Sequence, residues 1–319
     1  MSTIATLRPP VRAAFEELID YAGLFPPATL PMDAAADDYA AARAGTAAWM
    51  LGRFVVPASR LDELARLRQA HAASGGLAVS AIVDASLDPR QWFGSVQDIL
   101  AAIARLQSDA PSVRVEALEV PLAPLLTARE TFDANVGQLG ALVDRAGLRH
   151  LPVYVELPAG AHAGDRLTGA MTALARARLR AKLRCGGVIA TAFPSIGDVA
   201  AFVAAAAEAG VAFKATAGLH HPVRHLDAAT GFTMHGFLNL LAAATFAARV
   251  APDTLSAIVA EEDARAFAFD ETSFAWRDER ATVDELKTMR ASAFAGYGSC
   301  SFDEPVEDLT ALGLLPAAA

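Results

Sequence analysis

The sequence predicts a closed (β/α)₈ barrel, with an open doubly wound parallel sheet as the alternative. Short apolar runs alternate with Ala-rich amphipathic stretches every ~30 residues, a rhythm typical of parallel sheets. Eight such units fit a chain of 319 residues. No Gly-x-Gly-x-x-Gly pattern follows the early apolar runs, which favours the barrel over the open sheet. We expect one barrel domain over residues 1–319, with irregular extensions at 1–18 and 296–319.

Eight runs are predicted as strands because they are apolar or β-branched and stop near Pro, Asp or Gly. In chain order they are residues 19–25, 49–57, 77–84, 113–121, 151–158, 179–184, 211–217 and 264–276. The first and the last of these have the weakest pattern. They are included because they complete the set of eight.

The stretches between these runs have the spacing of amphipathic helices. The predicted helices are residues 33–45, 59–73, 96–107, 132–147, 195–210 and 283–294. Ser59 followed by Asp62 has the spacing of a capping box, and Gly210 is suited to end a helix. A very apolar stretch at 237–250 is too short to span a bilayer, and we expect either a core helix or a subunit interface.

The composition excludes several classes of protein. Apolar residues make up 54% of the chain, enough for a large core, and the net charge of −9 argues against general nucleic-acid binding. The first residues lack the apolar segment of a signal peptide, and only two cysteines are present. We therefore expect a cytoplasmic protein that acts on a small anionic metabolite, with no membrane or nucleic-acid partner and with homo-oligomerisation left open.

The placement of lysine is the first indication of chemistry. Only three of the 27 basic residues are lysines, and two of them, Lys182 and Lys214, lie in predicted strands, whereas Lys287 lies in a polar helix. A desolvated amine can lose its proton and attack a carbonyl, which a guanidinium cannot do. The alternative is that each buried lysine only forms an ion pair with a carboxylate.

Three carboxylates are expected near these lysines, because in such barrels the active site lies at the carboxyl ends of the strands. Asp84, Glu119 and Glu156 each lie at or near the end of a predicted strand. Alternation along the strand directs Glu119 inward, and we assign Glu119 and Glu156 to proton transfer. Asp84 is a candidate for substrate binding, although Asp84 and Glu156 could instead cap a helix or pair with a base.

Other polar residues near the same strand ends are candidates for substrate binding. Arg184 could bind an anion, the backbone amides of Gly186 and Gly187 could approach it closely, and Thr216 ends the strand of Lys214. The two glycines could equally well form only a turn.

A histidine-rich turn follows the strand of Lys214. His220, His221 and Arg224 are further candidates for substrate binding. Adjacent residues of an extended chain point in opposite directions, so we expect only one of the two histidines to face the site. No recognised metal-ligand spacing is present, and both Cys185 and Cys300 are expected to be inert.

Two segments around the lysines resemble deoxyribose-phosphate aldolases, which are class I barrel aldolases. Residues 182–187 (KLRCGG) and 214–218 (KATAG) are similar to the lysine segments of strands six and seven in that family. The resemblance implies that Lys182 forms a Schiff base and that Lys214 lowers its pKa. It covers about 40 residues, and Leu183 and Arg184 replace the family's threonine and serine. The rest of the chain matches no characterised enzyme family, and its pattern is typical of a bacterial protein.

Three functions are compatible with these residues. The first is a class I aldolase or Schiff-base lyase that acts on a small anionic carbonyl compound, a sugar phosphate or a keto acid, and needs no cofactor. The second is an enolising or aldol-type lyase that uses a divalent metal, Mg²⁺ or Mn²⁺, bound by Glu119, Glu156 and Asp84. The third is a barrel that binds a small ligand without catalysis.

Overall fold

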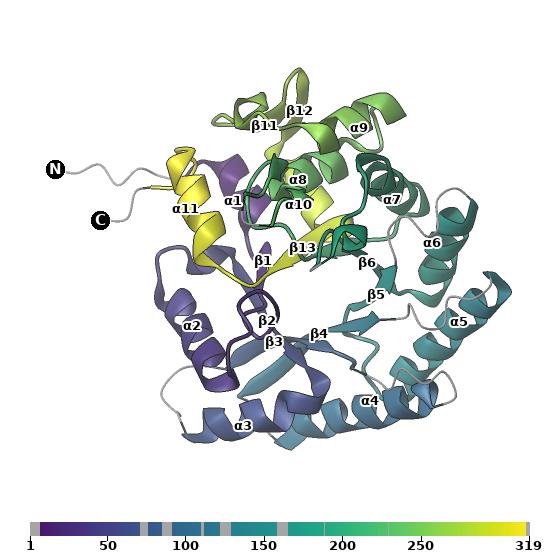
Figure 1. The fold of residues 1–319 in the computed structure, drawn as a ribbon. Coiled ribbons are helices and arrows are strands. Elements are labelled where there is room, and N and C mark those ends of the chain that lie inside the picture. Colours follow the sequence, from purple (N-terminus) through teal and green to yellow (C-terminus); the bar gives the residue numbers. More distant parts are fainter. Residues whose placement is uncertain are drawn as a thin grey trace.

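The structure, a computed structural model, is a closed parallel β-barrel surrounded by helices (Figure 1). It describes residues 7–70, 76–84, 91–109, 112–121, 129–157, 165–187, 189–228 and 230–316. Within these residues, eight parallel strands close in the order β1-β13-β7-β6-β5-β4-β3-β2. This confirms the predicted barrel and excludes the open sheet.

Seven barrel strands lie where the sequence predicts them. They are β1 (Ile19–Tyr21), β2 (Leu51–Pro57), β3 (Leu77–Ile82), β4 (Val113–Pro121), β5 (Val153–Leu157), β6 (Arg180–Arg184) and β7 (Phe213–Thr216). Because β1 is the first barrel strand, Lys182 and Lys214 lie on the sixth and seventh strands, as expected.

The eighth strand is not the predicted one. The strand that closes the barrel is β13 (Phe294–Ser299), which pairs in parallel with both β7 and β1. The predicted segment 264–276 instead contains the first two strands of a small antiparallel sheet, β10 (Phe267–Phe269), β11 (Ser273–Trp276) and β12 (Glu279–Thr282). Asp270 accepts hydrogen bonds from the backbone of Thr272 and Ser273, and this turn reverses the chain between β10 and β11.

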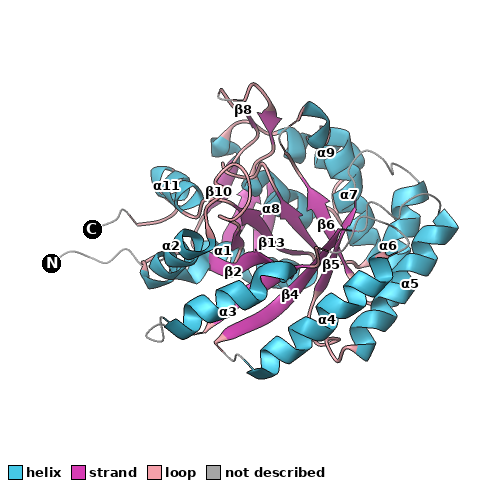
Figure 2. Cartoon of the chain, turned by 60° about the horizontal axis from the view of Figure 1, so that its bottom comes forward, coloured by secondary structure: helices cyan, strands magenta, loops and turns pink. Residues whose placement is uncertain are grey.

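The helices surround the barrel as a ring (Figures 1 and 2). They are α1 (Pro9–Phe15), α2 (Met32–Ala44), α3 (Leu61–Ala70), α4 (Trp92–Asp109), α5 (Arg129–Arg145), α6 (Asp165–Ala177), α7 (Ile196–Ala209), α8 (Phe237–Phe246), α9 (Pro252–Ala260), α10 (Val283–Ser292) and α11 (Asp303–Ala311). The segments expected to be irregular therefore contain α1, the end of β13 and α11.

Helix α7 shows how the local sequence sets the ends of an element. Ser195 and Asp198 form a capping box, and Gly210 ends the helix in the left-handed conformation that glycine adopts without strain. Residues 190–209 are long and apolar enough by composition to cross a membrane. In the fold, however, α7 is only 14 residues long, about 21 Å against ~30 Å of bilayer hydrocarbon, and it buries one face in the protein.

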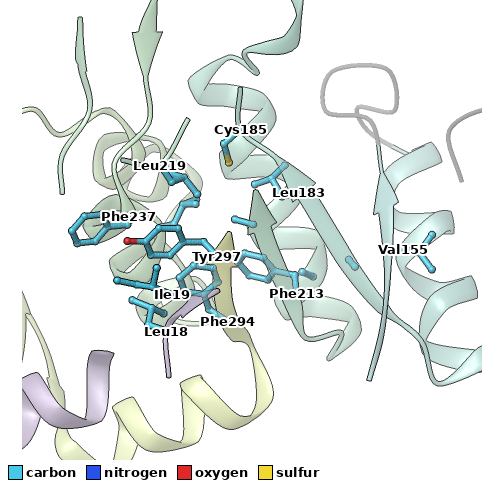
Figure 3. Packing of buried hydrophobic residues seen from close by; sticks show 14 of the residues in the cluster. Leu18, Ile19, Val155, Leu183, Cys185, Phe213, Leu219, Phe237, Phe294 and Tyr297 are labelled. Atoms are coloured by element: carbon cyan, nitrogen blue, oxygen red, sulfur yellow. The ribbon is translucent and has the colours of Figure 1, made fainter. Parts of the chain in front are cut away.

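The core lies between the outer face of the barrel and the helices. Outward-facing residues of neighbouring strands pack together, for example Phe213 of β7 with Phe294 of β13 at a ring distance of 5.2 Å (Figure 3). Tyr297 stacks on Phe237 of α8 at 5.5 Å. Apolar packing on the outer face leaves the alternate, inward-facing positions free for polar residues.

Candidate active site

The two strand lysines lie side by side inside the barrel. Lys182 of β6 and Lys214 of β7 are partners in the strand register, and Glu156 of β5 is the partner of Lys182 on its other side. Only 6% of Lys182 and 2% of Lys214 is exposed to solvent. Buried ammonium groups need compensating charge, so their partners define the site.

Glu119 of β4 joins the two lysines. One of its carboxylate oxygens, Oε2, lies 2.7 Å from Lys182 Nζ, and the other, Oε1, accepts a hydrogen bond from Lys214 Nζ. Oε1 also accepts a hydrogen bond of 2.7 Å from the hydroxyl of buried Ser80 on β3. Glu119 is 2% exposed and has both oxygens satisfied, so it is a fixed bridge between the two amines.

Asp20 of β1 completes the buried cluster, and the sequence analysis did not select it. Its Oδ2 atom lies 2.5 Å from Lys214 Nζ, and its Oδ1 atom accepts a hydrogen bond of 2.6 Å from the backbone N–H of Arg53. A Cβ atom at Gly52 would come within 2.2 Å of Oδ1, so glycine at this position makes room for the carboxylate. The sequence feature that could have identified Asp20 is that it is a single charged residue inside the apolar strand 19–21.

Glu156 and Arg184 connect the cluster to solvent. Glu156 Oε2 lies 3.0 Å from Lys182 Nζ, and its Oε1 lies 3.7 Å from Arg184 Nη1. The Glu156 side chain is 19% exposed and that of Arg184 is 48% exposed. Of the two lysines, Lys182 is therefore the one with a partner that reaches solvent, whereas the partners of Lys214, Glu119 and Asp20, are both buried.

The electrostatics of the cluster differ from those that the aldolase resemblance implies. Burial alone would lower the pKa of Lys182, but Glu119 and Glu156 outweigh it and raise that pKa above its ordinary value. Lys214 acts in the expected direction and lowers the pKa of Lys182, but it is the weakest of these influences. The pKa of Lys214 is likewise raised, by Asp20 and Glu119 against burial. In the isolated protein both amines are protonated at neutral pH.

Glu119 has the opposite shift. Burial would raise its pKa, but the two neighbouring ammonium groups hold the pKa well below its usual range. Glu119 is therefore a carboxylate in the isolated protein, and it cannot donate a proton until a lysine charge is moved or neutralised.

The predicted metal ligands do not form a metal site. Both oxygens of Glu119 contact lysine, and Asp84 is exposed at the surface, where it bonds to the backbone and hydroxyl of Ser59. The Ser59 hydroxyl therefore bonds to Asp84 and does not form the predicted capping box with Asp62. Among the described residues, no three His, Cys, Asp or Glu side chains converge on a point suited to a metal ion.

The glycines after β6 have a packing role. A Cβ atom on Gly186 would come within 3.1 Å of the Gly218 backbone, and one on Gly187 within 2.7 Å of Ala192. Glycine thus allows the ends of β6 and β7 to lie close together. Arg184 donates a hydrogen bond of 3.0 Å to the Gly186 carbonyl, and Thr216 lies at the same register level as Arg184.

The histidine-rich turn contacts carboxylates of α11, a helix that the sequence analysis did not predict. His220 Nδ1 lies 2.7 Å from Glu304, and His221 Nδ1 lies 2.7 Å from Asp308, one helical turn further along. Both histidines therefore have acidic partners on α11. Arg224 pairs with Glu262, so its charge is already compensated.

A separate cavity of about 400 Å³ lies beside this turn. Arg224, Phe193 and His235 line it together with residues of the small hairpin formed by β8 (His225–Leu226) and β9 (Thr233–Met234). His235 is 3% exposed and donates from Nε2 to the carbonyl of Pro194 at 2.8 Å. Burial lowers the pKa of His235, which keeps this side chain uncharged at neutral pH.

Comparison with known proteins supports the fold. A deoxyribose phosphate aldolase from Aeropyrum pernix, described as a unique tetrameric structure, aligns over 95% of this chain and 93% of its own with a TM-score of 0.50 and 14% identity. A citrate lyase from Burkholderia xenovorans aligns over 86% and 90% with a TM-score of 0.36 and 12% identity. At this identity, what the aldolase and this chain share is the barrel. No protein-family model and no curated protein matches the sequence.

Proposed function

We propose that this protein is a class I aldolase or a related Schiff-base lyase that acts on a small anionic carbonyl compound. The observation that carries the proposal is the pair of buried lysines on adjacent strands, joined by the single carboxylate of Glu119. Perturbed amines and acids gathered inside one barrel are typical of catalytic sites. The aldolase with the same fold makes this chemistry a natural candidate.

Lys182 is the amine that we assign to the covalent step, because its partner Glu156 is partly exposed while both partners of Lys214 are buried. Its proton passes to Glu156, and the neutral amine adds to the substrate carbonyl carbon. The carbonyl oxygen then leaves as water after taking up two protons, and an iminium ion remains. Lys214 stays protonated between Asp20 and Glu119.

The iminium ion then accepts the electron pair of the neighbouring carbon–carbon bond as that bond breaks. The leaving fragment becomes an aldehyde when its hydroxyl proton is removed, and Glu156 is the base that we propose for this transfer. Protonation of the resulting enamine and hydrolysis of the imine regenerate Lys182. In the reverse direction, Lys182 and Glu156 have the same roles and the carbon–carbon bond is formed.

Arg184 is the residue that we assign to the anionic group of the substrate. It is half-exposed beside Glu156, and its contact with that carboxylate, at 3.7 Å, is too long for a good hydrogen bond. While its Nε atom donates to the Gly186 carbonyl, its terminal nitrogens can bind a phosphate or carboxylate. Arg224 is a weaker candidate because Glu262 already neutralises it.

Borohydride trapping tests the proposal. The protein is incubated with a panel of aldehydes, keto acids and sugar phosphates, reduced, digested and analysed by mass spectrometry. We expect a reduced adduct on Lys182, lost in Lys182→Met. Lys287→Met is the matched control, because Lys287 is two-thirds exposed on α10.

Two outcomes would count against an aldolase. Absence of an adduct across the panel, with turnover that a chelator abolishes, would favour the metal-dependent lyase despite the poor fit of the carboxylates. A ligand that raises the melting temperature but is recovered unchanged would favour a non-catalytic binding barrel. An adduct on Lys214 alone would retain the chemistry but reverse the roles of the two lysines.

A further inference from the structure

Cys300 lies at the carboxyl end of the barrel beside a histidine and a glutamate. It follows directly after β13, two residues beyond Gly298, which is the register partner of Asp20. Its thiol is partly exposed, and Sγ lies 3.7 Å from Nε2 of His220. Cys300 therefore has a histidine partner that the sequence analysis did not identify.

His220 is held between two groups from separate parts of the chain. Its Nε2 atom faces Cys300, and its Nδ1 atom lies 2.7 Å from Glu304 Oε2 in the first turn of α11. The side chain of His220 is only 18% exposed. A thiol, an imidazole and a carboxylate in this order form the arrangement that activates a nucleophile: the carboxylate orients the ring, and the ring takes the thiol proton.

The surrounding groups favour the protonated form of His220. Its hydrogen bond with Cys300 and the proximity of Glu304 raise the pKa of His220 to about 9, against the opposing effect of burial. Other charged groups nearby are Asp303 on α11 and the pair of His221 with Asp308. Tyr21 of β1 is neutral, since burial and Asp38 raise its pKa.

The second cysteine provides a contrast within the same chain. Cys185 is fully buried, and burial alone raises the pKa of its thiol. No charged group contributes to that shift, so nothing near Cys185 favours a thiolate. The two cysteines thus differ in access, and Cys300 has a histidine partner.

We propose that Cys300, His220 and Glu304 form a second nucleophilic centre, at which a thiolate adds reversibly to small aldehydes at the barrel mouth. The sulfur forms a bond to the aldehyde carbon, the carbonyl electron pair moves to oxygen, and His220 Nε2 gives its proton to that oxygen. The product is a neutral hemithioacetal and a neutral imidazole, and no other reactant is needed. The choice of aldehydes rests on the proposed function, whereas the reactivity of Cys300 does not.

Alkylation by iodoacetamide tests the reactivity of Cys300. At pH 6–7 we expect Cys300 of the folded protein to react at least about tenfold faster than in His220→Gln, because an unassisted thiol with a pKa of about 8.5 is almost entirely protonated there. Cys185 should stay unlabelled in the same sample. Glu304→Gln changes a half-exposed side chain, so it tests the centre even if His220→Gln fails to fold, and it should slow alkylation in the same direction. Equal rates in the wild type and in both variants would overturn the proposal.

Protection by propanal tests the aldehyde adduct. We expect propanal to slow the alkylation of Cys300 in the wild type and equally in Lys182→Met, and the protection should disappear on dilution. If Lys182→Met loses the protection, an imine on Lys182 caused it and the hemithioacetal is ruled out. If borohydride traps no lysine adduct but Cys300 remains reactive and protected, the proposed function fails while this centre stands.

Discussion

Glu119 is the residue on which the buried charges depend. Among the described residues it is the one carboxylate that contacts both lysines, and removing it would leave two ammonium groups beside one fewer anion in a region closed to water. The other buried carboxylate of this cluster, Asp20, contacts Lys214. Loss of the Glu119 carboxylate should therefore lower the stability of the fold as well as the activity of the site.

We predict that Glu119→Gln lowers the free energy of unfolding at pH 7 by about 3–5 kcal/mol, the typical cost of breaking a buried ion pair. Urea denaturation measures the change. The matched control is Glu63→Gln, which removes an exposed pair with Arg60 and should cost about 0.5 kcal/mol or less. Similar losses in the two variants would show that the cluster is not an important source of stability.

The same residue predicts how stability depends on pH. The pKa of Glu119 is lower in the folded chain, so its contribution is present above the unfolded value of about 4.3 and is lost as the pH falls below it. The raised pKa values of the lysines make their contribution persist up to about 10.4 and decline above that pH. Between pH 5 and 2.5, the wild type should lose stability more steeply than Glu119→Gln; parallel curves would contradict this.

Glu156 contributes to the raised pKa of Lys182. Glu156 is one of the two carboxylates that raise the pKa of Lys182, so Glu156→Gln should lower that pKa. The pH profile of borohydride trapping is then expected to shift its midpoint to lower pH. If Glu156 also transfers protons, the plateau rate should fall as well. A midpoint that stays in place or moves to higher pH would contradict the assigned electrostatics.

At the scale of elements, β13 explains why the eighth strand was misassigned. Its sequence, FAGYGS, contains two glycines, which are rare in strands, whereas 264–276 has the apolar and aromatic pattern that usually marks one. Gly296 lies at φ +151°, and a Cβ atom there would come within 2.5 Å of the Leu18 carbonyl oxygen. Close packing against the start of β1 therefore selects glycine against strand propensity.

Two alanine substitutions in β13 distinguish the effect of close packing on stability from the effect of strand propensity. Gly296→Ala should cost about 2–3 kcal/mol, because it combines a strained backbone with a steric clash. Gly298→Ala places its Cβ atom 3.4 Å from Thr216 Oγ1, close to ordinary contact, and should cost much less. Thermal or urea unfolding compares the two. Equal destabilisation would mean that the Leu18 contact does not govern the choice of residue.

At the scale of the whole molecule, the barrel closes between the two ends of the chain. Strand β13 lies between β1 and β7 and completes the hydrogen bonding of both. Asp20 and Lys214, which are 194 residues apart, can therefore form an ion pair only in the closed barrel. Closure and assembly of the site are the same structural event.

A chain that ends at residue 293 should lose its cooperative unfolding transition, because β1 and β7 would then be open edges. A chain that ends at Ser299 keeps all eight barrel strands and lacks α11, so it should unfold cooperatively but at lower temperature. Circular dichroism during heating distinguishes the two. A cooperative transition in the shorter chain would show that β13 is dispensable for folding.

The sequence by itself determined the barrel class, seven of its strands and the places of Lys182, Lys214, Glu119 and Glu156, because alternation and strand-end position are local properties. Only the tertiary structure decided which segment closes the barrel, that Asp20 belongs to the cluster, and that Cys300 lies beside His220. It also decided that the net shift in the pKa of Lys182 is upward, although Lys214 acts in the expected direction. The reason is that these features depend on contacts between residues far apart in the chain, whose distances and net charge are settled only when the barrel closes.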